Sequence, residues 1–428
     1  MCKLNDFLGN GARFYIDRGQ HPEYATPECL YMRELIACEK AGEKILAMIR
    51  EIVEKKMRIE YDNHSLNLTI LKNNTDAFNH SYGCHENYLI YKETLTQVQG
   101  LLSPLTPFLV ARQIVAGTGC ALSSKPYFIS QKSQYIERFV NSTTTNSRPI
   151  INLRSISEPL ADVFKYHRLH LILGDSNMSE YAMYLKVGLT SMILEIMEDQ
   201  YEPLWNINLS LLDPVEALHE ISQDPSCTIK VLLRNGDALN AVEILEKYAQ
   251  IMEKYYFHDK QERLTDEKKD IYEKFVYVIA CLKKNPALLY GKLDWITKKI
   301  VIEQSLKKYG STWENYRDKM VVINGEETPL SDHVQTIDLQ YHNIDESNSI
   351  YYLLERKGHM ERIVSDEEIK LAMTEPPEGT RAKIRGKFIK KYHNEPHAHV
   401  NWDYIRYSSP LSLVPYEKSL IDPFTNEN

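Results

Sequence analysis

Hydrophobic and polar positions alternate strictly over residues 13–17, close to the start of the chain. In a strand, Phe14 and Ile16 would point to one side, because successive side chains face opposite ways. Three polar side chains would share the other side: Arg13, Tyr15 and Asp17. The pattern therefore predicts a strand with one buried face and one polar face.

A helical pattern follows this strand. Thr26 is a plausible N-cap, and Pro27 would then occupy the first helical position, where proline is favoured. An apolar stripe at helical spacing continues to about Met57. We therefore predict a long helix that begins at Pro27.

Strand and helix patterns then alternate to the end of the chain. Strands are predicted at 66–70, 88–91, 127–130, 135–141, 149–153, 167–173 and 400–407. Helices are predicted over 176–199 and 380–392. A further helix is predicted to start at Asp213-Pro214, and helices are expected to dominate from there to about residue 308. This order predicts an α+β fold, with a mainly antiparallel sheet packed on helices in residues 1–350 and a small C-terminal domain in residues 351–428.

Composition narrows the class of protein. The 428 residues include 51 Lys and Arg against 59 Asp and Glu, so the net charge of −8 gives no reason to expect binding to nucleic acid or to an anionic membrane. The seven cysteines form no CxxC pair, and no leader or membrane-length apolar run is visible. We expect a soluble cytoplasmic protein with reduced thiols.

Three acidic residues are candidates for chemistry. On the polar strand face, Asp17 could act as a general base and Glu23 could hold Mg²⁺, although the spacing alone favours a solvated face with cross-strand ion pairs. Glu86 could be a carboxylate ligand or a polar residue at a turn. Arg381 and Arg385 share a helix face that could bind phosphate or face solvent. No Walker A motif or GxGxxG sequence is present.

Eight segments, in order, resemble the motifs of the Pup ligase and depupylase family. They are NGARFYIDRGQHPEYATPEC (10–29), KNNTD (72–76), SYGCHENYLI (81–90), TPFLVARQ (106–113), SRPIIN (147–152), YHRLHLILGDSNMSE (166–180), LDWITKK (293–299) and PPEGTRAKIRG (376–386). The resemblance implies a fold similar to glutamine synthetase that binds ATP and Mg²⁺. The segments GQHPEYAT, GCHENY and GDSNMSE look more like the ligase branch.

The resemblance also implies a reaction. The ligase phosphorylates the γ-carboxylate of the C-terminal glutamate of Pup, the prokaryotic ubiquitin-like protein. A lysine amine of a target protein then attacks this γ-glutamyl phosphate, and the isopeptide product is marked for the proteasome. The alternatives are a depupylase or deamidase, which hydrolyses at the same glutamate position, and a catalytically impaired Pup-binding relative.

Residue roles follow from the resemblance alone. Asp17 matches the catalytic base, Tyr15 and Glu23 match metal positions, and Glu86 is a further acidic candidate. The nucleotide contacts matched are Arg13, Thr26 and Trp402. Family members also begin with a strand of the G-I-E-T-E-F-G type whose glutamate binds Mg²⁺. The nine residues before Asn10 contain no such strand, which implies a different start or one missing metal ligand and an unpaired strand edge.

Overall fold

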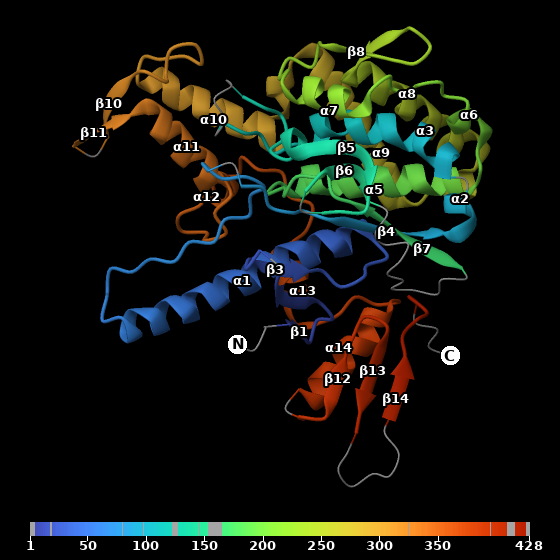
Figure 1. Ribbon diagram of the computed structural model, residues 1–428, viewed down its shortest axis with the longest axis horizontal. Coiled ribbons are helices and arrows are strands. Elements are labelled where there is room, and N and C mark those ends of the chain that lie inside the picture. Colours follow the sequence, from blue (N-terminus) through green and yellow to red (C-terminus); the bar gives the residue numbers. More distant parts are fainter. Residues whose placement is uncertain are drawn as a thin grey trace. The chain divides into compact units, whose positions relative to one another are not determined.

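The computed structural model (Figure 1) describes residues 5–17, 19–78, 80–96, 98–121, 127–144, 146–152, 165–323, 325–393, 395–408 and 416–424. The chain divides into two compact units. The first contains Met1–Leu68, Glu158–Arg168 and Ile363–Asn428, and the second contains Thr69–Ser157 and Leu169–Arg362. This division does not coincide with the boundary predicted near residue 350, because the two ends of the chain share one unit.

The N-terminal part of the first unit forms a three-stranded antiparallel sheet. Its strands lie in the order β1 (Asn5–Phe7), β2 (Arg13–Ile16) and β3 (Pro22–Ala25). Phe14 is buried on one face of β2, as the alternation predicted. The sequence analysis expected no strand before Asn10 and an unpaired sheet edge, but β1 lies there and pairs with β2 through a turn in which Gly11 has a φ of 80°. Residues other than glycine rarely adopt this left-handed backbone conformation. A Cβ at this position would also clash with the backbone of Ala382.

Helices and a second small sheet complete the first unit. The helix α1 (Met32–Glu60) packs against α13 (Asp366–Thr374). The C-terminal segment forms α14 (Arg381–Tyr392) and the antiparallel strands β12 (Ala398–Val400), β13 (Tyr404–Tyr407) and β14 (Tyr416–Ser419). In Figure 1 these strands, drawn in red, lie beside α14, and Phe388, Ile405 and Leu420 form the core between them.

The second unit contains a four-stranded sheet in the order β4 (Glu86–Tyr91), β7 (Tyr166–Leu171), β6 (Arg148–Asn152) and β5 (Ile136–Asn141). β5 and β6 run parallel, whereas β6 and β7 are antiparallel. Two hairpins accompany it: β8 (Lys230–Leu232) with β9 (Ala238–Asn240), and β10 (Met320–Ile323) with β11 (Glu326–Pro329). The prediction of an α+β fold with mainly antiparallel strands is confirmed.

Helices form most of the core of the second unit. They are α2 (Lys92–Thr96), α3 (Val98–Ala111), α4 (Gln113–Ala116), α5 (Glu180–Glu198), α6 (Glu202–Trp205), α7 (Pro214–Ser222), α8 (Ala241–Glu253), α9 (Asp266–Lys284), α10 (Asp294–Lys308), α11 (Leu330–Tyr341) and α12 (Ile350–Arg356). α5 is buried on nearly all sides and packs against α9 and β4. No described helix is both long and apolar enough to cross a membrane.

Four local predictions were wrong in an informative way. The first helix begins at Met32 rather than at Pro27. Residues 66–70 form no strand, and Leu71 makes only an isolated bridge to Asn343. Residues 127–130 form no strand either, and Phe128 makes only an isolated bridge to Cys120. The strand predicted over 400–407 is a hairpin, since β12 ends at Val400 and β13 begins at Tyr404. At the start of the first helix, contacts distant in sequence decide the backbone path, and a local pattern does not contain them. The hairpin is a local feature, because β12 and β13 pair with each other across a short turn.

Candidate active site

The register of the first sheet collects polar and aromatic side chains on one face. Tyr15 lies opposite Asn5 on one side and Glu23 on the other, and Arg13 lies opposite Phe7. Residues directly opposite in an antiparallel sheet share a face. The polar face predicted for β2 therefore extends over all three strands of this sheet.

Tyr15 and Glu23 form the most tightly coupled pair on this face. The Tyr15 hydroxyl donates a hydrogen bond to Glu23 Oε1. Burial, followed by this bond, raises the pKa of the Tyr15 phenol. Burial also raises the pKa of the Glu23 carboxyl, and the charge of Asp17 adds to that effect, while the Tyr15 bond and Arg13 oppose it. A carboxylate held in this way is one that a nearby cation would stabilise.

Asp17 lies just beyond β2, in the turn that leads to β3. The backbone amide of His21 donates to Asp17 Oδ1 at 2.8 Å, and the His21 imidazole lies 3.3 Å from Oδ2. The Asp17 side chain remains 32% exposed. The turn thus fixes a carboxylate that an approaching substrate can still reach.

Arg13 is held in place without being neutralised. Its Nε donates to Asn5 Oδ1 at 2.8 Å, and its guanidinium carbon lies 4.6 Å from the centre of the Tyr15 ring. No acidic side chain among the described residues pairs with its two terminal nitrogens. Those nitrogens form a fork suited to a phosphate group.

Trp402 comes from the C-terminal segment to the same face. It lies in the turn between β12 and β13, and its ring packs edge-on against Phe7 with centroids 5.0 Å apart. The Arg13 guanidinium lies 6.0 Å from the Trp402 ring. Thr26 directly follows β3, next to Ala25, which is the cross-strand partner of Arg13. Six of the seven predicted site residues therefore belong to the first unit and to this region of it.

A buried ionic cluster supports this arrangement. Arg385 lies beneath Trp402, with its guanidinium 4.8 Å from the ring, and donates to the Gly11 carbonyl at 3.0 Å. Glu28 accepts from Arg381 at 2.7 Å and also pairs with Arg385. The two arginines outweigh the effect of burial, so the pKa of Glu28 is lowered. Arg381 and Arg385 are therefore buried partners of Glu28. They do not form the solvent-facing basic surface that the sequence analysis considered.

Glu86, the seventh predicted residue, lies in the second unit at the start of β4. Its two oxygens accept from Arg112 at 2.8 Å each, and Tyr88 donates to Oε2 at 2.6 Å. Although burial would raise its pKa, the charges of Arg112 and Lys186 lower it. A buried ion pair is a sufficient role for this carboxylate, so we leave Glu86 out of the proposed metal site.

The sequence analysis missed Asn5, Phe7 and Glu28 as site components. Asn5 and Phe7 belong to the short strand β1, and their two-residue spacing before a glycine turn was the available signal. Glu28 had no local signal, because its partners lie more than 350 positions away. Among the described residues, His, Cys, Asp and Glu side chains form no metal-binding group of three or more. A metal site on this face would therefore need the Tyr15 phenol or backbone and substrate oxygens.

Comparison with known proteins gives one consistent result. The Pup-ligase protein family matches residues 1–406. The chain is 40% identical to the Pup–protein ligase of Acidimicrobium ferrooxidans, over 99% of this chain and 88% of that protein. It is 37% identical to the Pup–protein ligase of a Nocardioides species, over 90% of this chain and 80% of that protein.

Solved structures agree with the sequence relatives. The Pup ligase PafA in complex with ADP matches with a TM-score of 0.86 and 29% identity, over 100% of this chain and 88% of that one. A complex between Pup and its ligase PafA matches with the same TM-score and identity, over 99% of this chain and 82% of that one.

Proposed function

Because the chain belongs to the Pup ligase family, we propose that the polar face of β1–β3 in the first unit is where it joins Pup to target proteins. The activity is an ATP-dependent ligation, and Pup is the partner. Its product is an isopeptide bond between the γ-carboxylate of the C-terminal glutamate of Pup and a lysine amine of the target.

The nucleotide is bound by Arg13, Thr26 and Trp402. The free nitrogens of the Arg13 guanidinium provide charge-assisted hydrogen bonds to phosphate oxygens. The Trp402 ring, supported edge-on by Phe7, offers an aromatic surface to the nucleotide. Thr26 adds a hydroxyl at the end of β3. The structure solved with ADP supports the use of a nucleotide.

The donors on this face fit Mg²⁺, which prefers hard oxygen ligands and usually takes one or two from the protein besides phosphate oxygens. Tyr15 and Glu23 would hold it: burial raises the pKa of Glu23, so a cation beside this carboxylate would stabilise its charged form. Bound there, Mg²⁺ would offset the negative charge that builds up during phosphoryl transfer.

Asp17 is the general base. A lysine amine has an ordinary pKa of about 10.4, so it is protonated near neutral pH and cannot attack until it loses that proton. The Asp17 carboxylate, oriented by the His21 amide, accepts the proton as the amine attacks the γ-glutamyl phosphate. Phosphate then leaves as the isopeptide bond forms.

One observation carries this assignment. The N-terminal strands and the C-terminal Trp402 bring a free guanidinium, aromatic rings and acidic side chains to one face of a single compact unit. The glutamate and phenol could serve a solvated sheet face by themselves. The aromatic pair beside an unneutralised arginine is better explained by a nucleotide.

The test is a ligation assay read by intact-protein mass spectrometry. The purified chain is mixed with Pup ending in glutamate, a lysine-bearing acceptor, ATP and Mg²⁺. We expect the acceptor to gain the mass of Pup less one water, only when ATP is present. Asp17→Asn should lower the rate by about 10²–10⁴-fold, the usual contribution of a general base.

Asp6→Asn is the matched control. Asp6 is an exposed carboxylate on β1, and its cross-strand partner is Phe14, so it lies on the opposite face of the same sheet. Its replacement should leave the rate unchanged. An Asp17→Asn protein that ligates at the normal rate would remove Asp17 from this role. Release of free acceptor from a Pup conjugate, without ligation, would instead establish a hydrolase.

A further inference from the structure

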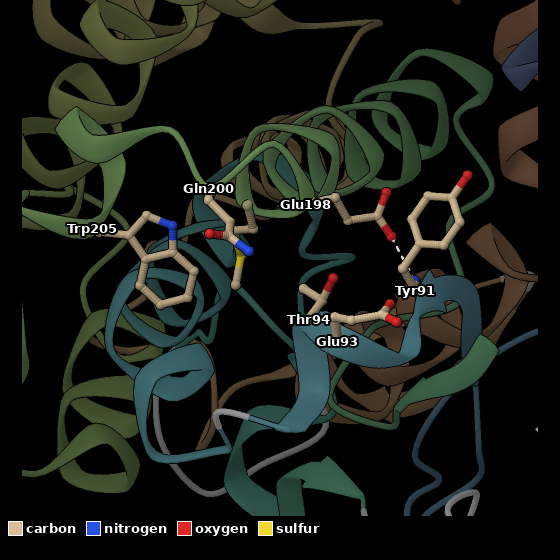
Figure 2. A pocket seen from close by; sticks show the side chains of 7 residues that line it. Tyr91, Glu93, Thr94, Glu198, Gln200 and Trp205 are labelled. Carbon is tan, nitrogen blue, oxygen red and sulfur yellow. Dashed lines mark hydrogen bonds between the residues drawn. The ribbon is translucent and has the colours of Figure 1, made fainter. Parts of the chain in front are cut away.

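The second unit contains a pocket far in sequence from every residue assigned to the ligation. Its volume is about 140 Å³, and Figure 2 shows its lining, which comes from the ends of β4 and α5 and from α2 and α6. A volume of this size holds one side chain, whereas pockets for cofactors and drug-sized ligands occupy about 300–1,000 Å³. The pocket therefore fits a side chain of a partner better than a nucleotide.

The pocket lies at a helix end with an unusual charge distribution. The C-terminal end of α5 carries Glu195, Glu198 and Asp199, and its last turn has no basic residue. The C-terminal end of a helix dipole is negative and favours cations. Three carboxylates there are therefore repelled by the dipole, and they also repel one another. Two of them are neutralised, because Lys268 lies 2.7 Å from Glu195 and Arg263 lies 2.8 Å from Asp199.

Glu198 is the one of these three carboxylates that makes no ion pair with a described residue. Its Oε1 accepts from the backbone amide of Tyr91 at 2.8 Å, and within the described part of the chain no basic side chain pairs with it. Burial, together with the charges of Glu195 and Asp199, raises the pKa of Glu198, although the Tyr91 bond and the charge of Arg263 oppose this. Glu198 lines the pocket beside Glu93, so a second carboxylate faces the same space (Figure 2).

The other end of the pocket supplies an apolar surface and a spare donor. Trp205 lies there, on the far side of the pocket from Glu198 (Figure 2), and Met197 adds an apolar contact. The indole Nε1 of Trp205 is buried and has no hydrogen-bond partner. A buried N–H without an acceptor is uncommon, and a ligand carbonyl would satisfy it.

These features define one ligand chemistry: a cationic head, an apolar stem and a carbonyl group. We propose that the pocket binds the side chain of a lysine or arginine residue presented by another protein. The cationic head pairs with Glu198, the methylene stem packs against Met197 and the Trp205 ring, and a backbone carbonyl of the partner accepts from Trp205 Nε1. The site binds without chemistry and is separate from the acceptor lysine that reacts.

The experiment measures binding directly, without ATP or Pup, so its outcome is independent of the proposed ligation. The full chain is titrated by calorimetry with Nα-acetyl-lysine N-methylamide. The norleucine derivative, which has the same stem without the ammonium, is the ligand control. We expect saturable binding of the lysine derivative in the millimolar range and none of the norleucine derivative.

Two variants locate the binding. Glu198→Gln keeps an acceptor for the Tyr91 amide but removes the charge, and it should raise the Kd about tenfold. Glu202→Gln, on the neighbouring helix and outside the pocket lining, removes an equal charge and should leave the Kd unchanged. The proposal would be overturned if the Glu198→Gln protein bound the lysine derivative as tightly as the wild type does. It would also be overturned if the norleucine derivative bound as tightly as the lysine derivative, or if the lysine derivative showed no saturable binding.

Trp205→Phe tests the carbonyl contact separately, and it remains informative if Glu198→Gln fails to fold. This change keeps an aromatic ring but removes the N–H group. It should weaken the lysine derivative about threefold and leave n-butylammonium, which has no carbonyl, unaffected. If n-butylammonium binds the wild-type chain as tightly as the lysine derivative, the pocket recognises free amines, and its assignment to a protein partner is wrong.

Discussion

Tyr15 has two contacts that can be separated by mutation. Its hydroxyl bonds to Glu23, while its ring lies against the Arg13 guanidinium. The hydroxyl belongs to the proposed metal site, and the ring keeps Arg13 in position for the nucleotide. A phenylalanine at this position removes the first contact and retains the second.

We therefore expect Tyr15→Phe to affect Mg²⁺ more than nucleotide. The Mg²⁺ concentration needed for half-maximal ligation should rise about 10-fold or more, in the range reported for lost ligand-shell contacts. The apparent affinity for ADP measured without Mg²⁺ should stay within about twofold, because the cation–π contact remains. Ligation rates over a Mg²⁺ titration and ADP binding by calorimetry provide the two measurements. Equal Mg²⁺ requirements would show that the phenol is no ligand.

Tyr24→Phe is a suitable control at the same scale. Tyr24 lies one position further along β3, on the opposite face, where its hydroxyl accepts from Asn10 at 3.1 Å. Loss of that hydroxyl should cost some stability but should not change the Mg²⁺ requirement. The pair of variants separates a metal effect from a general effect of losing a phenol.

The start of α7 could be predicted from the sequence, whereas the start of α1 could not. The two differ in whether the contacts that fix the helix start are local or distant in sequence. Asp213 caps α7 by accepting from the backbone amides of Val215 and Glu216, at 2.9 and 3.0 Å, as the sequence predicted. All of these groups lie within four residues. A local pattern therefore contained everything that decides this helix start.

The first helix shows the opposite case. Thr26 and Pro27 have the composition of a helix start, yet α1 begins at Met32. The Glu28 side chain is bound by Arg381 and Arg385, and the hydroxyl of Thr380 donates to the Glu28 carbonyl at 2.8 Å. Contacts with the C-terminal segment thus hold residues near Glu28 outside the helix. A single sequence does not reveal such partners, so the local signal was misleading.

The cap of α7 allows a quantitative prediction at the scale of the element. Asp213→Ala removes both hydrogen bonds and the favourable charge at the helix N-terminus, so it should lower the free energy of unfolding by about 1 kcal/mol. Asp213→Ser keeps an acceptor and should lose much less. Amide hydrogen exchange of the α7 peptide, read by mass spectrometry, measures both. Equal protection of α7 in the alanine and aspartate proteins would show that the cap adds nothing.

In the whole molecule, the two ends of the chain meet in the first unit through a charged cluster rather than through apolar packing alone. Glu28 follows the N-terminal sheet, whereas Arg381 and Arg385 belong to α14 near the C-terminus. Arg385 is completely buried and also contacts Gly11 and Trp402. The same cluster therefore closes the unit and supports the proposed nucleotide contact. The α+β class and the six residues proposed for the site followed from local patterns and the resemblance. This closure did not, because its partners are distant in sequence.

Glu28 should make the first unit sensitive to acid. Its pKa is lowered in the folded protein from an ordinary value of 4.5, so its contribution to stability is complete above about pH 4.5 and is lost as the pH falls through the lower, folded value. Glu28→Gln leaves Arg385 buried without a counter-charge and should cost about 3 kcal/mol at pH 7. The remaining dependence on pH between 5 and 3 should then be shallower than in the wild type.

Glu378→Gln provides the comparison, because Glu378 also pairs with α14, at 2.6 Å from Lys383, but is 77% exposed. An exposed pair of this kind contributes about 0–1 kcal/mol, so its loss should hardly change stability or its pH dependence. Hydrogen exchange of peptides from α1 and α14 reports on the first unit specifically and should be measured at pH 7 and after exposure to acid. If the two glutamine variants behave alike, the closure of the unit rests on apolar packing, and the buried arginines position Trp402 without holding the chain ends together.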